Sequence, residues 1–179
     1  MVASNPTLAV STSGTPKESE MKESVLDILI YLFENYFDAD IESAPEPDRD
    51  TLKDELERAG FSEREVERAL EWLEQLSADP QRSGVSPTAR AIRVFDPREL
   101  ARLDTDCRGY ILYLENIGIL SAAQRELAID RLLALDAAQI DIEQVKWVVL
   151  MVLFSQPGQE SAYLRMEDLV FDNRLDIVH

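Results

Sequence analysis

The stretch DIEQVKWVVLMVLF, residues 141–154, decides the fold of this chain. Asp141 and Gln144 have the spacing of a capping box, in which two side chains satisfy free backbone groups at the start of a helix. Ile140 and Val145 have the spacing of the hydrophobic staple that often accompanies it. From Val145 onward the apolar residues lie all the way round, so the pattern predicts a helix that is buried on every side. A β-branched strand is the competing interpretation, since periodicity alone does not separate the two, but the caps favour a helix.

Amphipathic spacing predicts further helices on both sides of this stretch. Ser62 begins one of them and Ser121 another, each followed three residues later by Glu or Gln as in a capping box. In contrast, AIRVF at residues 91–95 alternates apolar and polar positions, which predicts one short strand without a visible partner. We therefore expect a mostly α protein of two small packed helical units, with at most a short β element near residues 91–95. The other expected helices lie at about residues 25–37, 50–59, 62–76, 96–103, 104–117, 121–135 and 163–170.

Composition divides the chain into four parts. Residues 1–20 are rich in Ser, Thr, Pro and Ala without a period, so we expect a disordered N-terminal extension, with Met21 as a candidate for the natural start. Residues 77–90 contain two prolines and a glycine, which predicts a linker. This linker separates an N-terminal helical unit, residues 21–76, from a C-terminal helical unit, residues 91–179.

The chain is strongly acidic and poor in the residues of common active sites. It has 18 Lys and Arg and 35 Asp and Glu, which gives a net charge of −17. The one histidine is His179 and the one cysteine is Cys107, so the usual proton-transfer group and the usual nitrogen and sulfur metal ligands are scarce. A lone cysteine forms no internal disulfide, and the longest apolar run, residues 147–154, is far below the roughly 20 residues of a membrane helix. We therefore expect a cytoplasmic protein without a membrane partner, whose charge disfavours nucleic acid.

No sequence motif predicts catalysis, a cofactor or a metal site. Nearby carboxylates such as Asp104 and Asp106 are interpreted as helix caps and solvated faces, because a chain with 35 acids forms such pairs by chance. Cys107 lies on the apolar stripe of its helix, which favours a buried structural thiol over a nucleophile. Trp72 and Trp147 are expected in the core. The expected function is therefore not enzymatic.

A cluster of arginines is the strongest candidate for a site. Six arginines lie between residues 82 and 108 against four acids, a net charge of +2 within a chain of −17. Two interpretations stay open: these arginines pair with the acidic N-terminal unit, or they bind a phosphate or a protein partner. The candidate partner-binding residues are Arg93, Arg98, Arg102 and Arg108.

Four segments together resemble the bacterial Smg family. They are MKESVLDILIYLFENYF from residue 21, GFSEREVERALEWLEQL from residue 60, RLDTDCRGYILYLENIGIL from residue 102 and VKWVVLMVLFSQPGQESAYLRMEDLVF from residue 145. The resemblance covers residues 21–179. It implies a domain of unknown function, whose genes are often found near those for a DNA-processing protein and topoisomerases, and it supplies no catalytic residues.

Two functions follow as hypotheses. The first is a non-enzymatic binding or regulatory protein that acts through protein contacts. The second is a nucleic-acid-associated factor linked to DNA processing or topology, whose C-terminal unit resembles a degraded winged helix. A basic recognition helix would support the second hypothesis, and the helix at 121–135 offers only Arg125 and Arg131.

Overall fold

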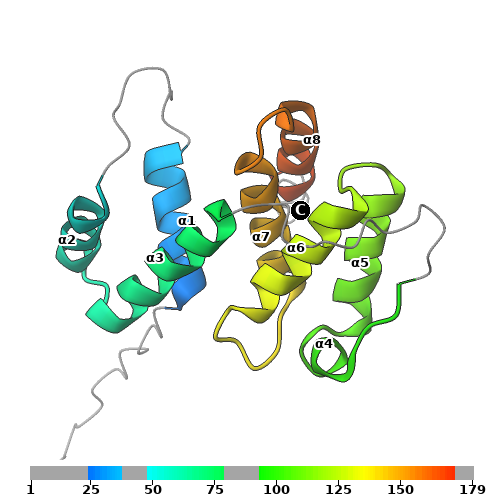
Figure 1. Ribbon diagram of the computed structural model, residues 1–179, viewed down its shortest axis with the longest axis horizontal. Helices are drawn as coiled ribbons and strands as arrows, with labels where there is room; N and C mark the ends of the chain where they lie inside the picture. Colours follow the sequence, from blue (N-terminus) through cyan, green and yellow to red (C-terminus); the bar gives the residue numbers. More distant parts are fainter. Residues whose placement is uncertain (1–23, 38–47, 79–92, 172–179) are drawn as a thin grey trace, which may run out of the picture.

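The protein is mostly helical, as the sequence predicts. A computed structural model describes residues 24–37, 48–78 and 93–171, and within these ranges it contains eight α-helices, one turn of π-helix and no strand (Figure 1). None of the helices in these ranges has the length and hydropathy needed to cross a bilayer. The elements are α1 (Val25–Leu32), η1 (Phe33–Phe37), α2 (Arg49–Ala59), α3 (Glu63–Ser77), α4 (Pro97–Arg102), α5 (Thr105–Asn116), α6 (Ala122–Leu133), α7 (Ile142–Phe154) and α8 (Glu160–Phe171).

Helix α7 is the buried axis that its apolar sequence predicts. Nine consecutive residues, 145–153, are buried, and α7 packs against α6 on one side and α8 on another. Asp141 and Gln144 form the complete capping box: the Asp141 carboxylate accepts from the Gln144 backbone N–H at 2.8 Å, and the Gln144 side chain accepts from the Asp141 backbone N–H at 3.0 Å. The helix interpretation of this stretch is confirmed, and the strand alternative is wrong.

Local capping explains where several other helices begin. Ser121 and Gln124 form a complete capping box at α6, and the Ser62 hydroxyl accepts from the Glu65 backbone N–H at the start of α3. Helix α2 ends at Gly60, whose φ of 105° is left-handed and costs glycine little. Short polar motifs therefore set the ends of these helices.

Two sequence predictions need correction. The helix expected over residues 25–37 is α-helical only to Leu32 and continues as π-helix from Phe33. The strand expected at residues 91–95 is wrong for residues 93–95, which belong to no strand; residues 91 and 92 lie outside the described ranges. No neighbouring backbone pairs with this segment in the described structure, and the Arg93 side chain is held by carboxylates instead. One isolated parallel bridge joins Leu103 to Ile140.

Buried residues from α1 to α8 form one continuous core. The Phe33 ring meets Trp147 edge to face with centroids 6.1 Å apart, which joins the N-terminal helices to α7. The Trp72 indole N–H of α3 donates to the carbonyl of Arg131 on α6 at 3.0 Å. Both tryptophans are buried, as the sequence predicts. Residues 1–20 and most of the expected linker 77–90 lie outside the described ranges, so the extension and the division into units 21–76 and 91–179 stay predictions.

Candidate partner-binding groove

The Arg93 side chain is largely buried and paired with two carboxylates. It is only 10% exposed, and its guanidinium donates bidentately to Glu99 at 2.6 and 2.8 Å and to Glu126 at 2.9 and 2.9 Å. The hydrogen bonds that Arg93 donates to Glu99 lower the pKa of the Glu99 carboxyl, and the same bonds raise the pKa of Arg93. The partners lie on α4 and α6 and not in the acidic N-terminal helices. Arg93 therefore fixes the start of α4 to α6.

The Arg93 pairs continue into a buried charge network that also reaches α5. Arg125, a buried residue of α6, donates to Glu126 at 2.8 Å and pairs with Glu115 of α5. Burial raises the pKa of Glu126, but hydrogen bonds from Arg93 and Arg125 outweigh that effect and leave it below its ordinary value. Two arginines and three glutamates thus connect α4, α5 and α6.

Arg108 is also used within the fold. Its guanidinium donates to the carbonyl of Leu103 at 2.7 Å and lies 5.7 Å from the centre of the Phe95 ring. Arg93 lies 4.4 Å from the same ring, so Phe95 is contacted by two cations. These contacts place Arg108 at the joint between α4 and α5.

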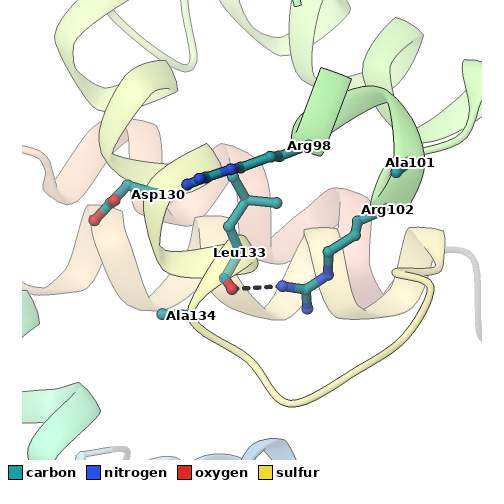
Figure 2. Close-up of a pocket in the computed structure, with 6 residues that line it drawn as sticks. All are labelled: Arg98, Ala101, Arg102, Asp130, Leu133 and Ala134. Carbon is teal, nitrogen blue, oxygen red and sulfur yellow. Dashed lines mark hydrogen bonds between the residues drawn. The ribbon is translucent and has the colours of Figure 1, made fainter. Parts of the chain in front are cut away.

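Arg102 caps the end of a neighbouring helix. It donates to the carbonyl of Leu133, the last residue of α6, at 2.6 Å (Figure 2). It also donates to the carbonyl of Leu135, just beyond the helix, at 2.7 Å. These carbonyls lack helical partners, so the arginine satisfies them. Its Nε is buried and has no acceptor among the described residues.

Arg98 differs from the other three candidates. It is exposed, and within the described ranges its guanidinium makes no ion pair and donates no hydrogen bond. In Figure 2 the side chain extends from α4 across α6 toward Asp130. It borders an open groove of about 620 Å³ between α4 and α6. The groove is lined by Arg98, Ala101, Arg102, Asp130, Leu133 and Ala134.

The groove combines an apolar floor with an available guanidinium. Leu133 and two alanines, Ala101 and Ala134, supply apolar surface. The carboxylate of Asp130 is engaged by Arg131 at 2.6 Å. A guanidinium beside apolar surface matches a carboxylate flanked by apolar groups, because its planar fork binds both oxygens. The arrangement can therefore bind an acidic segment and position it.

Cys107 is a structural thiol, as its place on the apolar stripe predicts. It is 1% exposed, burial raises its pKa to about 12, and its Sγ lies 3.3 Å from the Ile140 carbonyl oxygen. The Asp104 carboxylate accepts from the Cys107 backbone N–H at 2.8 Å, and this cap lowers the pKa of Asp104. Among the described residues, no three His, Cys, Asp or Glu side chains are grouped so as to hold a metal ion.

The sequence grouped four candidate arginines in one segment, but it did not show that their structural roles differ. Glu99 follows Asp96 by three residues and so completes a visible capping box, but Arg93 reaches it from six residues away, a spacing with no local signature. Arg125 and Arg131, the two cations that the helix at 121–135 offers to nucleic acid, are both buried and ion-paired. Only the packing of α6 separates buried arginines from exposed ones.

These observations define a mostly helical protein with an arginine-lined groove at the junction of α4 and α6. The profile of the family described as "Protein of unknown function (DUF494)" matches residues 25–179. Relatives named Protein Smg homolog are 53% identical over 160 residues in Methylococcus capsulatus and 53% identical over 159 residues in Alkalilimnicola ehrlichii. Each match covers 89% of this chain and all of the relative. The chain belongs to the Smg family, as the four segments indicate. No solved structure matches it at a significant level.

Proposed function

We propose that this Smg-family chain is a non-enzymatic cytoplasmic protein that binds an acidic segment of a protein partner in the α4–α6 groove. The observation that carries the proposal is Arg98, an exposed guanidinium without an ion pair in the described structure, at the edge of a groove. The net charge of −17 makes an unused cation at such a place notable, because carboxylates outnumber cations almost two to one.

The groove supports a peptide-like ligand more than a bare anion. Its apolar lining comes from Ala101, Leu133 and Ala134. Apolar surface contributes binding free energy and a guanidinium contributes orientation, a division of roles typical of protein interfaces. An acidic segment with one or two apolar side chains would use both features.

The nucleic-acid alternative has less support from the distribution of charge. A protein that binds a phosphate backbone neutralises several phosphates with separate cations. On α6, Arg125 and Arg131 are buried and paired with carboxylates, so they do not add to the cation at Arg98.

Affinity capture with the full chain tests the proposal. The chain is immobilised and exposed to lysate, with and without nuclease treatment, from a bacterium that encodes a Smg-family protein. We expect Arg98→Glu to reduce capture of the bound proteins about tenfold or more, since it replaces an attraction with a repulsion. Arg64→Glu is the matched control, because Arg64 is exposed on α3 and also makes no ion pair within the described residues. Equal capture by both variants would refute the proposal that the groove binds the partner. Capture that nuclease abolishes would favour the nucleic-acid alternative.

A further inference from the structure

A second surface, separate from the groove, lies on the outward face of α5. Leu112 and Tyr113 are two of the five large apolar or aromatic residues that are exposed in the described structure, with 36% and 49% of their surfaces accessible. Gly109 and Asn116 are exposed on the same side of the helix, three to four residues away. We call Gly109, Leu112, Tyr113 and Asn116 the α5 face.

Gly109 has no role that the fold itself explains. It lies in the middle of a helix with no left-handed φ, and a Cβ at this position would meet nothing within 4 Å. Glycine in a helix interior is less favourable than alanine, because it loses more backbone freedom on folding. A missing side chain on an exposed helix is useful where another backbone must approach closely. The exposed glycine therefore leaves room on this face for the backbone of a partner.

Tyr113 is partly ordered for such a contact. Its ring stacks on Tyr110, with centroids 6.3 Å apart and an angle of 30° between the rings. Burial raises the pKa of Tyr110 to about 12, so this ring stays neutral and Tyr113 rests on a fixed, uncharged platform. A half-exposed tyrosine held in one orientation loses little freedom on binding, which is why tyrosine is common at interface centres.

Acidic side chains at the starts of α5 and α7 lie toward the N-terminal end of the α5 face, and we call them its border. The bridge between Leu103 and Ile140 brings the starts of α5 and α7 together, and each helix begins with an exposed aspartate cap, Asp104 and Asp141. Asp106 is exposed on the first turn of α5. Glu143 of α7 contributes to the raised pKa of Tyr110, which places its charge near the stacked rings.

The cations near this border do not cancel its charge. Lys146 pairs with Glu143 at 2.8 Å, and its own side chain is buried. Arg108, the cation on α5, donates to the Leu103 carbonyl and contacts the Phe95 ring, and its charge offsets part of that of Asp104 without forming an ion pair. Three aspartates remain without a cation paired to them in the described structure. The border is therefore complementary to a positively charged partner.

We propose that the α5 face binds a basic amphipathic helix of a protein partner. Its apolar residues would pack on Leu112 and Tyr113, its backbone would approach at Gly109, and its Lys or Arg side chains would meet the aspartates. A second copy of this chain is the wrong occupant, because two molecules of charge −17 repel each other. The proposal is independent of the α4–α6 groove, which takes a partner segment of opposite charge.

Site-specific photo-crosslinking tests this surface. p-Benzoylphenylalanine is incorporated at Leu112 of the full chain, in a bacterium that encodes a Smg-family protein, and the cross-linked peptide is identified by mass spectrometry. The expected product is a Lys- or Arg-rich helical segment. Gly109→Gln should lower its yield about tenfold or more, because a side chain now blocks the close approach. The same variant should melt at or above the temperature of the unsubstituted chain, since glutamine is the better helix former.

Two controls separate the possible outcomes. Ser161→Gln makes a similar change on the exposed face of α8 and should leave the cross-link unchanged. Arg98→Glu should also leave it unchanged, which distinguishes this surface from the groove. A cross-link to a second copy, to an acidic segment or to lipid would overturn the proposal. So would a cross-link that survives Gly109→Gln, or the absence of any cross-link from position 112.

Discussion

The α2–α3 hairpin and the α4–α6 junction are both held by networks of cations and glutamates, but in different surroundings. In the hairpin, Lys53 pairs with Glu63 at 3.0 Å and with Glu67 at 2.7 Å, and Arg49 pairs with Glu67 at 3.0 Å. Arg49, Glu63 and Glu67 are each 46% or more exposed, and Lys53 is 26% exposed. At the α4–α6 junction, the paired Arg93 and Glu99 side chains are each only 10% exposed.

This difference in burial gives similar pairs different consequences. Water screens the hairpin pairs and solvates either partner if the other is removed. At the junction, removing one partner leaves a charge that water reaches poorly, so the loss is large even where the intact pair adds little. In this acidic protein, the arginines of the junction serve mainly to hold helices, and Arg98 is the exception.

The largest expected loss of stability comes from a substitution outside both networks, at Trp147. The ring is buried in α7 and meets Phe33 edge to face, so it joins the N-terminal helices to the core. Trp147→Ala should lower the free energy of unfolding by about 3 to 5 kcal/mol through lost burial and the cavity that remains. Chemical denaturation measures this loss. An unchanged denaturant midpoint would contradict the central place of α7.

The next largest loss of stability is expected for Arg93→Ala, and it should distinguish the buried network from the exposed one. The change leaves Glu99 and Glu126 without their main cation, and we expect a loss of about 3 kcal/mol in the free energy of unfolding. Arg49→Ala is the matched change in the hairpin and should have a much smaller effect, because its side chain is 47% exposed. Denaturation of both variants under the same conditions makes the comparison. Losses of similar size would remove the distinction between the networks.

The junction should also respond to acid through Glu99. Hydrogen bonding from Arg93 lowers the pKa of this carboxyl from its ordinary value of 4.5, so its contribution to stability is complete above that pH and is lost as the pH falls through the folded-state pKa. Glu99→Gln cannot take up this proton. Below about pH 4.5 its free energy of unfolding should therefore fall less steeply than that of the unsubstituted chain. Parallel slopes for the two proteins would contradict the pairing.

Substitution in the hairpin network should change the melting temperature only slightly, and salt should reduce that change. Lys53 has a raised pKa, first because of its hydrogen bond to Glu67, but its charge is open to water. Lys53→Ala should shift the melting temperature only slightly, and the shift should shrink further at about 1 M salt, where screening acts over roughly 3 Å. Thermal melts at low and high salt measure both effects. A large shift in melting temperature that persists in high salt would show that the hairpin pairs behave like the buried pairs of the junction.

Much of the fold could be predicted because its signals are local. The capping box at Asp141 and the apolar residues after it identified α7, and spacing at Ser62 and Ser121 placed the starts of α3 and α6. The failure at residues 91–95 has a physical reason. Alternation is typical of an extended backbone, but a strand also needs a partner, and the Arg93 segment is held by side-chain pairs instead.

The candidate site was predictable as a segment and not as individual residues. Net charge showed that arginines gather between residues 82 and 108, but each role depends on neighbours distant in sequence. Glu126 lies 33 residues from Arg93, and the carbonyl of Leu133 lies 31 residues from Arg102. Arg98 differs from them because no such neighbour reaches it in the described structure. Tertiary contacts therefore decide which arginine is available to a partner.

The central claim is that Arg98 is available to a partner while Arg93 holds the fold, and one measurement tests it most directly. The free energy of unfolding of Arg98→Ala is compared with that of Arg93→Ala by denaturant titration at neutral pH. We expect Arg98→Ala to stay within about 0.5 kcal/mol of the unsubstituted chain, as surface substitutions usually do, against the loss of about 3 kcal/mol for Arg93→Ala. A loss for Arg98→Ala as large as that for Arg93→Ala would show that both arginines hold the fold, and would contradict the account.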